Sequence, residues 1–409
     1  LRTQAGTAIG PERFRMRIAI QGAGIAGPAL AWWLRKCRHE VLLVERAPAL
    51  RSGGYIIDFW GVGYDIAQKM GLLPQIREQG YPVKEVRFVD QDGCKCGGFP
   101  VDVFARMTGG RYTSLRRSDV AATIYRALDG GVERIFGDSI AGIEERNGCA
   151  RVSFDHAAAR DVDLVIGADG LHSRVRGLKF GPEDKFETFL GYYVGAFEIQ
   201  GYRPRDELVY VSHANPGRQI SRFSMRDDKT LFLFVFREEY LPKSYYRGSA
   251  SAKDLLTGAF SDMGWECPRI LAAMSAVEEI YFDRVSQIRM PRWTDGRVAL
   301  IGDAAACVSF LAGEGTGLAM AEAYALAGEL RRHGNDYVAA FASYEQRMMP
   351  FLRQKQDAAA KFASAFIPKS ILGLSFRNIV ISLLDFRWIA DSVVGHMVRD
   401  DVALPDYEF

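Results

Sequence analysis

Gly22-Ala23-Gly24-Ile25-Ala26-Gly27 is the stretch that decides the fold of this 409-residue chain. It follows the short apolar run Met16–Ile20 and precedes apolar side chains at helical spacing from Leu30 to Cys37. These signals predict a strand, a tight turn and a helix. The continuous apolar run Val41–Val44 then predicts a parallel strand buried on both faces, so that a βαβ unit is complete by Glu45.

The three glycines of this stretch have separate roles in a turn that binds phosphate. Gly22 permits the tight turn, Gly24 lets the backbone approach a pyrophosphate, and Gly27 lets the helix and the strand pack closely. Ile25 and Ala26 stand where the helix begins, and the free amides and partial positive charge of a helix N-terminus favour anions. The stretch therefore predicts a site for a dinucleotide diphosphate. A glycine-rich turn that binds nothing is the alternative.

Glu45 ends the second predicted strand, eighteen positions after Gly27. A carboxylate at this place can accept hydrogen bonds from both hydroxyls of an adenosine ribose, and it would repel a 2′-phosphate. The strand, the turn and the acid together predict a cofactor that contains ADP. They do not distinguish NAD from FAD.

The composition is that of a globular protein that binds a small molecule. The hydrophobic fraction is 48%, and the net charge is only +2, which lacks the basic footprint of a nucleic-acid-binding protein. Six cysteines without a C-x-x-C pair predict neither a disulfide framework nor a metal site, and Cys94 and Cys96 fall in a predicted hairpin turn. Residues 1–15 lack the apolar core of a secretory signal, so we expect an extension outside the fold and a cytoplasmic location.

A second domain is predicted where the pattern changes, between about residues 186 and 237, to longer strands rich in aromatic residues. Gln219–Met225 and Leu231–Phe236, joined by a polar turn, predict antiparallel pairing. Three alternate side chains of the second strand share one face of the sheet: Phe232, Phe234 and Phe236. Core packing is their expected role, and a border with the cofactor is the alternative.

The order of these signals predicts an α/β fold, in which a Rossmann-like doubly wound domain contains an inserted antiparallel β-sheet domain. We expect the chain to divide into an extension at 1–15, a cofactor domain at 16–180 and 285–365, a substrate-binding sheet domain at 181–284, and a C-terminal helical segment at 366–409. Part of 75–115 is expected to contribute to the substrate side. The apolar stretch 369–389 is interrupted by Arg377, Asp385 and Arg387, which predicts a helix packed over the cofactor domain and no transmembrane segment.

Two further turns carry acidic residues after predicted strands. Gly167-Ala168-Asp169-Gly170 leads into a basic segment, and an Asp-Gly turn whose carboxylate satisfies local amides is its alternative interpretation. Gly302-Asp303 follows the strand Val298–Ile301, and Gly313-Glu314-Gly315-Thr316-Gly317 opens an Ala-rich helix. The carboxylate of Asp303 can bind ribityl hydroxyls, while the amides of the last three residues of that helix start can face the N1 and C2 carbonyl of a flavin. An ordinary glycine-rich loop is the alternative.

Taken together, the three motifs resemble the FAD-dependent aromatic hydroxylase family, which includes p-hydroxybenzoate hydroxylase and the tetracycline-modifying flavin monooxygenases. The likeness runs from Arg17 to about Leu330. The family's motifs match, in chain order, Gly22, Gly24, Gly27, Glu45 and Arg46, then Asp169-Gly170, then Gly302-Asp303. The resemblance also implies that Arg117, with Arg116 as the alternative, contacts the flavin. Similarity to the tetracycline-type branch implies that Arg51 and Asp58 lie beside the isoalloxazine ring.

The resemblance implies a monooxygenase with FAD as its cofactor, NADH or NADPH as a transient reductant and O2 as a co-substrate. A flavin C4a-hydroperoxide would transfer one oxygen atom to a small aromatic or polyketide-like substrate. Because the cofactor carries the hard chemistry and the protein supplies binding and orientation, no catalytic acid or base is assigned. The identity of the substrate and the oligomeric state do not follow from the sequence.

The chain departs from the family pattern at Ala306-Cys307, Phe310-Leu311 and Glu314, which affects expectations for the substrate side. A charge that favours the helix N-terminus is the expected role of Glu314. Two other functions stay open: a flavin-dependent reductase or dehydrogenase of an unsaturated hydrophobic substrate, and a non-catalytic flavin-binding protein. A flavin halogenase is disfavoured because the chain has no W-x-W segment.

Overall fold

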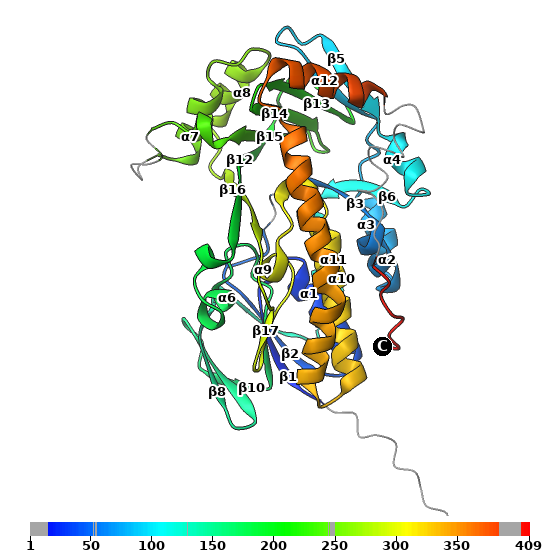
Figure 1. The fold of residues 1–409 in the computed structure, drawn as a ribbon, viewed down its shortest axis with the longest axis vertical. Helices are drawn as coiled ribbons and strands as arrows, with labels where there is room; N and C mark the ends of the chain where they lie inside the picture. Colours follow the sequence, from blue (N-terminus) through cyan, green and yellow to red (C-terminus); the bar gives the residue numbers. More distant parts are fainter. Residues whose placement is uncertain are drawn as a thin grey trace, which may run out of the picture.

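The computed structural model describes residues 15–409 except 52, 54, 129, 244, 246–249 and 384–401. The extension expected at 1–15 therefore lies, apart from Arg15, outside the described residues. Figure 1 shows two layers of structure along the long axis, a parallel sheet with its helices at one end and a second sheet at the other. Two long helices run between them.

The first sheet has six strands, and its four inner strands are buried on both faces, as their continuous apolar runs predict. Its order is β17 (Thr294–Asp295), β18 (Val298–Leu300), β11 (Leu164–Gly167), β1 (Arg17–Gln21), β2 (Glu40–Glu45) and β7 (Glu133–Phe136). All neighbouring pairs are parallel except β17 with β18. The central strand β1 pairs with β2 on one side and with β11 on the other, so it brings the first two motifs together.

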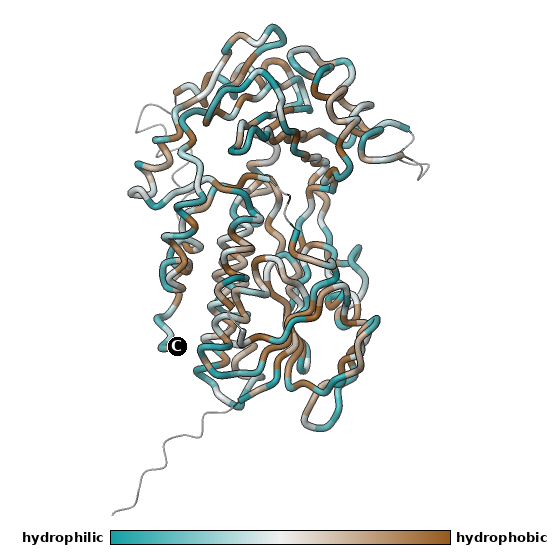
Figure 2. The backbone as a smooth tube through the Cα atoms, turned by 180° about the vertical axis from the view of Figure 1, so that it is seen from behind, coloured by the Kyte–Doolittle hydropathy of each residue, from teal (hydrophilic) through white to brown (hydrophobic). Residues whose placement is uncertain are grey.

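Helices cover this sheet and carry the glycine-rich turns. They are α1 (Ala26–Lys36), α5 (Arg117–Arg126), α6 (Arg174–Lys179), α9 (Asp303–Ala306), α10 (Gly315–His333) and α11 (Tyr337–Phe366). The edge-to-face contact of Trp33 with Tyr324, at 4.9 Å between ring centroids, joins α1 to α10. In Figure 2 the apolar segments gather in the interior of this domain, and hydrophilic segments mark the outer loops.

A three-stranded antiparallel sheet and a short two-stranded sheet flank this domain. The three strands are β8 (Ile140–Arg146), β9 (Cys149–Phe154) and β10 (Arg160–Val162). The two strands are β3 (Ile56–Trp60) and β6 (Tyr112–Arg116), and the helices near them are α2 (Gly61–Lys69), α3 (Leu73–Glu78) and α4 (Asp102–Met107). Figure 1 shows β3 and β6 between the upper sheet and helices α2 and α3.

The upper sheet has seven strands, and its pairs are antiparallel except β13 with β4. Its order is β16 (Tyr281–Ile288), β12 (Glu187–Gln200), β15 (Lys229–Arg237), β14 (Arg218–Ser224), β13 (Val209–Asn215), β4 (Glu85–Val89) and β5 (Lys95–Pro100). A doubly wound domain with an antiparallel sheet is thus the fold that the sequence predicts, and this prediction is confirmed. Cys94 and Cys96 lie at the exposed β4–β5 hairpin.

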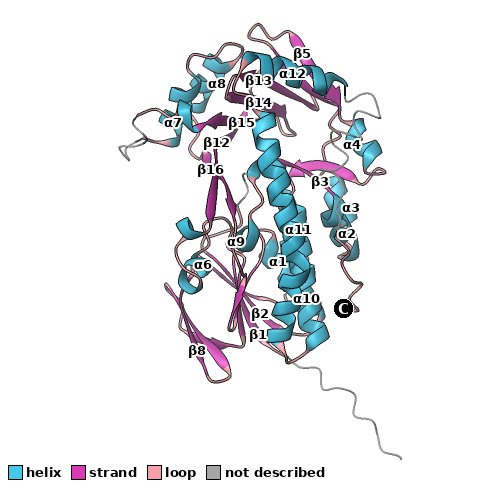
Figure 3. Cartoon of the chain, in the orientation of Figure 1, coloured by secondary structure: helices cyan, strands magenta, loops and turns pink. Residues whose placement is uncertain are grey.

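The three alternate phenylalanines of β15 face away from the cofactor domain. Phe232, Phe234 and Phe236 are fully buried, and the rings of Phe234 and Phe236 contact Phe260 edge to face. Phe260 belongs to α7 (Ala252–Phe260), which together with α8 (Cys267–Met274) covers this face (Figure 3). Core packing is therefore what these side chains do, and the alternative, a border with the cofactor, is wrong.

The position of the helix near the C-terminus differs from the expected one. Helix α12 (Ile371–Ser382) packs on the upper sheet and not over the cofactor domain, because Arg377 donates to Gln219 Oε1 at 2.9 Å and its guanidinium covers the ring of Phe88. Four apolar side chains of α12 are 59 to 83% exposed: Ile371, Leu372, Phe376 and Ile379. None of the helices that the structure describes is long and apolar enough to cross a bilayer.

The last eight residues, 402–409, are not helical, unlike the segment expected for 366–409. They lie on the cofactor domain, where the ring of Phe409 is 4.4 Å from that of Trp33. Tyr407 occupies the space beside Gly328 and donates its hydroxyl to the buried carboxylate of Glu329 at 2.5 Å. Residues 384–401, which include part of the predicted apolar stretch, lie outside the description.

Candidate functional site

The first motif forms a turn in which side chains have no room. Gly22 has φ +108°, and a Cβ atom there would lie 2.4 Å from the carbonyl oxygen of Ala168. A Cβ at Gly27 would lie 1.9 Å from the carbonyl oxygen of Gly22. The turn and the close approach of helix to strand both therefore require glycine, as the sequence predicts. The contact with Ala168 also places the second motif against the first.

Arg117 reaches the first motif from the start of α5. A Cβ atom at Gly24 would lie 3.7 Å from Nη2 of Arg117, and the Arg117 N–H donates to the carbonyl of Tyr55 at 3.1 Å. Arg116 instead donates through Nε to Asp119 at 3.0 Å. Of the two arginines that the sequence offers, the structure therefore places Arg117 beside the glycine turn. The first turn of α5 has no side-chain cap from Ser118 or Asp119.

Glu45 holds the loop around the first motif from the end of β2. Its Oε2 accepts the Ala23 N–H at 2.7 Å, and its Oε1 accepts the Ala47 N–H at 2.9 Å. Each carboxylate oxygen keeps a second lone pair, so Glu45 can still accept hydrogen bonds from ribose hydroxyls. The side chain of Arg46 is exposed next to it.

Asp169 of the second motif is an acceptor for the first turn of α6. Its oxygens accept the Ser173 hydroxyl at 2.5 Å and the backbone N–H groups of Arg174 and Val175 at 2.7 and 3.1 Å. Burial raises the pKa of Asp169 above its ordinary value, against the lowering effect of these hydrogen bonds. The local capping role that the sequence analysis kept as an alternative is present in the structure.

Arg176 was missed by sequence reasoning, and it joins the second motif to the third. Its guanidinium is fully buried and donates to the carbonyl of Leu171 at 2.6 Å, to Glu183 at 2.7 Å and to the carbonyl of Ala304 at 3.1 Å. Burial lowers the pKa of Arg176, although Glu183 acts in the opposite direction. The basic character of the segment after Asp169 was the only signal in the sequence.

His172, next to that motif, bridges two elements. Its ring nitrogens lie 2.9 Å from Oε1 of Glu183 and 3.2 Å from Oδ1 of Asp283 on β16. The hydrogen bond that His172 donates to Asp283, above all, raises the pKa of His172 to about 9. A protonated imidazole thus ties the cofactor domain to the upper sheet.

The third motif adjoins the first. Gly302 has φ +63°, and a Cβ there would lie 3.1 Å from the Cβ of Ala26 at the start of α1. Asp303 opens α9, and a Cβ at Gly315 would lie 3.7 Å from Oδ1 of Asp303. The carboxylate of Asp303 therefore stands next to the start of α10, where Thr316 is buried.

The start of α10 is also crossed by α2. A Cβ at Gly63 would lie 2.3 Å from the Cα of Gly317, so the two backbones touch. Glu314 precedes this start without capping it through its side chain, and it pairs with Lys355 at 2.9 Å. The carboxylate of Glu314, expected to favour the helix N-terminus by its charge, thus also forms an ion pair with α11.

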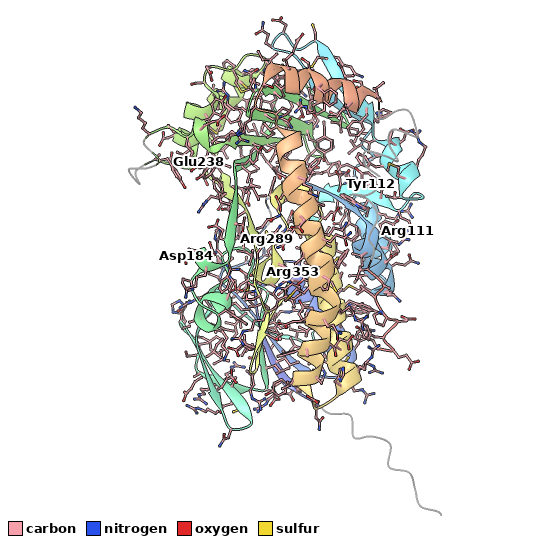
Figure 4. The ribbon with its side chains drawn as sticks, viewed as in Figure 1. Arg111, Tyr112, Asp184, Glu238, Arg289 and Arg353 are labelled. Carbon is pink, nitrogen blue, oxygen red and sulfur yellow. The ribbon has the colours of Figure 1, made fainter. Side chains whose placement is uncertain are left out.

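Asp58 faces the start of α10 from β3. Its Oδ1 accepts the hydroxyls of Tyr112 and Ser114 on β6, each at 2.5 Å (Tyr112 is labelled in Figure 4). Burial raises the pKa of Asp58 above its ordinary value, and the two donors oppose this. A small pocket lies between β3, the first turn of α2 and the start of α10. Its lining residues are Asp58, Phe59, Trp60, Val62, Glu314, Gly317 and Leu318. Arg51 is exposed on the segment before β3.

An aromatic cluster lies beside these residues. The ring of Tyr55 is 4.5 Å from that of Phe310, and the ring of Tyr281 stacks on Phe310 at 6.2 Å. Burial raises the pKa of Tyr55, and the nearby Arg117 lowers it. Tyr55 and Tyr281 were not predicted as site residues, because Tyr55 directly precedes β3, Tyr281 opens β16 of the upper sheet, and the two come together only through the packing of these two sheets.

The three motifs thus meet in one region. Close backbone contacts fix their turns, while two of their glycines have open space beside them in which a ligand could lie. Gly24 has only Arg117 within van der Waals reach of a Cβ, and Gly315 has only Asp303. Exposed amides at two helix starts, with Asp303, Glu45 and Arg117 near them, suit a long cofactor that has a diphosphate. Within the described part of the chain, no cluster of three or more His, Cys, Asp or Glu could hold a metal ion.

Known proteins are similar to this chain in both sequence and fold. The family model described as FAD binding domain matches residues 15–359. An uncharacterized protein of Mycobacterium tuberculosis is 38% identical over 346 residues, which cover 83% of this chain and 91% of that protein. A flavin-dependent monooxygenase from an unknown prokaryotic organism is 33% identical over 354 residues, covering 87% of this chain and 90% of that protein. The solved structure of tetracycline destructase Tet(51) matches with a TM-score of 0.80 and 31% identity, covering 96% of this chain and 100% of that chain.

Proposed function

Since this chain belongs to the FAD-binding family of flavin-dependent monooxygenases, we propose that it uses NADH or NADPH and O2 to hydroxylate a small aromatic or polyketide-like substrate. Bound FAD supplies the redox chemistry, since it accepts a hydride and activates oxygen. The protein binds and orients the reactants and excludes water from them.

The cofactor contacts in this proposal follow the geometry of the motifs. Amides at Gly24, Ile25 and Ala26 would hold the diphosphate, and Glu45 with Arg46 would hold the adenosine. Asp303 would hold the ribityl hydroxyls. The ring system would lie among Arg51, Asp58, Arg117 and the helix start Gly315-Thr316-Gly317. Asp169 would have an indirect role, since it holds the turn at the start of α6 beside the cofactor.

One row of side chains across the upper sheet carries the substrate part of the proposal. Cross-strand pairing puts these side chains on one face, opposite to the face of Phe232, Phe234 and Phe236. The row runs Ser212, Ser221, Leu233, Ala196 and Tyr281. It ends where Tyr281 stacks on Phe310, and Phe310 contacts Tyr55 beside Arg117.

This row offers both kinds of contact that a ring substrate needs. The hydroxyls of Ser212 and Ser221 lie 2.8 Å apart and are buried, while Leu233 and Phe310 supply apolar surface. Binding sites for small organic ligands are mostly apolar, with a few convergent polar groups. The similarity to a tetracycline destructase favours a fused-ring substrate, because tetracycline is a fused-ring polyketide.

The proposal is tested with the purified protein, FAD and a panel of phenols and fused-ring polyketides. We expect at least one compound to accelerate NADH or NADPH consumption under air and to gain sixteen daltons from oxygen. A product that forms equally well without oxygen would instead establish the reductase alternative. Flavin that binds but never turns over with any donor would establish the non-catalytic alternative.

A pair of variants tests where the substrate binds. Phe310→Ala is expected to raise the KM for an active compound about tenfold, since it removes an apolar ring from the row's end. Phe341→Ala is the control, because Phe341 contacts Tyr337 in the first turns of α11, at the end of that helix far from the upper sheet (Figure 1). Equal effects of the two substitutions on KM would contradict the assignment.

A further inference from the structure

We propose that Glu322 is a neutral carboxylic acid that positions the Gly302-Asp303 turn, and thereby the carboxylate that holds the flavin chain. Glu322 is on α10, seven positions after Gly315, and it touches neither the glycine turn of α1 nor the aromatic cluster through any hydrogen bond of the described residues. It is a positioning residue. The inference rests on the proposed role of Asp303.

The contacts of Glu322 converge on one oxygen. Its Oε2 accepts the N–H of Gly302 at 3.0 Å and lies 2.9 Å from the phenol oxygen of Tyr344. The same phenol oxygen lies 3.2 Å from the carbonyl oxygen of Leu300. A phenol has one hydrogen for these two acceptors. A proton on Glu322 lets both contacts be hydrogen bonds, with the carboxyl donating to the phenol and the phenol donating to Leu300.

The surroundings of Glu322 disfavour a negative charge. Its side chain is 1% exposed, and no ion pair among the described residues reaches its carboxyl group. A buried, unpaired carboxylate is costly and takes up a proton instead. Burial raises the pKa of Glu322 well above its usual range; the contacts with Tyr344 and the Gly302 N–H act in the opposite direction, and the neighbouring Asp303 adds to the rise.

Glu329, one heptad along the same helix, shows the opposite arrangement. It is also fully buried, but its carboxylate lies 3.1 Å from Nε of Arg347 and 3.4 Å from Nη1 of Arg332. Two arginines therefore pair with that carboxyl group. The helix therefore carries two buried glutamates with different tasks, and Glu329 provides a matched control.

The turn that Glu322 holds has little freedom. Gly302 adopts φ +63° and abuts Ala26, and Asp303 follows it directly. Loss of the acceptor would leave the N–H of Gly302 buried and unpaired, and the turn would have to move to find another partner. Asp303 would then shift relative to the starts of α1 and α10. Cofactor affinity should report this shift.

The test compares Glu322→Gln, Glu322→Ala and Glu329→Gln in the full chain, with FAD as the probe. The amide oxygen of Gln can accept the N–H of Gly302, which is the contact that holds the turn, so Glu322→Gln should keep the FAD dissociation constant within about threefold and keep the flavin absorption spectrum. Glu322→Ala should weaken FAD binding by about tenfold or more. Glu329→Gln should lower the Tm, because it removes the charge between two arginines. Equal weakening by Gln and by Ala would overturn the proposal.

A spectroscopic measurement decides the protonation state without relying on FAD. The infrared spectrum of the chain should contain a carboxylic acid C=O band that shifts in D2O and disappears in Glu322→Gln. Tyr344→Phe should shift this band, and it serves where Glu322→Ala does not fold. Absence of the band at neutral pH would overturn the proposal. If wild-type protein fails to bind FAD, the proposed function fails, while the infrared band still decides whether Glu322 is neutral. If Asp303→Asn leaves FAD affinity unchanged, the assignment of Asp303 fails, and the proposed link from Glu322 to the cofactor fails with it.

Discussion

The guanidinium of Arg176 donates to the carbonyl oxygen of Ala304 at 3.1 Å, and this bond fastens the turn of Asp169 to the turn of Asp303. The two residues that this bond joins are 128 positions apart in the sequence. A fully buried arginine with three acceptors is a rigid link, because without it the carbonyls of Leu171 and Ala304 would lose this donor and Glu183 would keep only His172 as its partner.

Replacement of this link should therefore be costly. We expect Arg176→Met to lower the free energy of unfolding by about 3 kcal/mol, because two buried carbonyls and Glu183 lose their donor. Urea denaturation measures the change. Arg174→Met is the control, since Arg174 forms an exposed pair with Asp155 at 2.5 Å, and exposed pairs contribute about 1 kcal/mol at most. Equal losses in the two variants would show that Arg176 is not a link.

A methyl group at Gly27 should abolish cofactor binding. The added Cβ would lie 1.9 Å from the carbonyl oxygen of Gly22, so Gly27→Ala must displace the turn. Equilibrium dialysis should detect no bound FAD at concentrations that saturate the wild type. Gly177→Ala is the control: Gly177 is exposed in α6 with nothing within 4 Å of its Cβ, and we expect a gain of about 0.5 kcal/mol in stability and unchanged FAD binding. Retention of FAD by Gly27→Ala would contradict the assigned turn.

His172 should make stability depend on pH above neutrality. Its pKa is raised from 6.5 to about 9 in the folded chain, chiefly by the hydrogen bond to Asp283. Its contribution is therefore fully present below pH 6.5 and is lost as the pH rises through about 9. Because half of the side chain is exposed, screening limits the effect to about 1 kcal/mol. Unfolding of wild type and His172→Gln, compared from pH 6 to 10, should show the slope in the wild type alone. Parallel curves would exclude His172 as its source.

Phe234 should matter for stability and not for catalysis. Phe234→Ala removes a fully buried ring that contacts Phe197 and Phe260, and we expect a loss of about 3 to 5 kcal/mol in the free energy of unfolding. The FAD dissociation constant should stay within a factor of about two, because the ring faces α7. A normal Tm with weakened FAD or substrate binding would place Phe234 in the site instead.

The sequence predicts the cofactor domain well, because local rules decide it. The apolar runs of β1, β2 and β11 are buried strands, and the glycines between them have the steric reasons that the turn requires. Periodicity also predicts β14 and β15, although it does not say which face of β15 meets which helix. That choice depends on α7 and α8, which follow later in the chain.

The polar interior of the site was not predictable in the same way. Arg176, His172 and Glu322 acquire their roles from partners 5 to 128 positions away, and no local pattern encodes those partners. The placement of α12 failed for a related reason. Its sequence is apolar enough to suggest a helix on the larger core, but the buried Arg377 finds its acceptor, Gln219, on the upper sheet.

Helix α12 is held by very few buried groups. Only Leu374 and Arg377 of its twelve residues are buried, and one buried leucine contributes about 2 kcal/mol. Local opening that lifts the helix should thus cost far less free energy than unfolding of any strand beneath it. Amide hydrogens of α12 should exchange with deuterium much faster than those of β14, and during each such opening the face of the sheet at Phe88 and Gln219 is in contact with solvent while every strand stays paired.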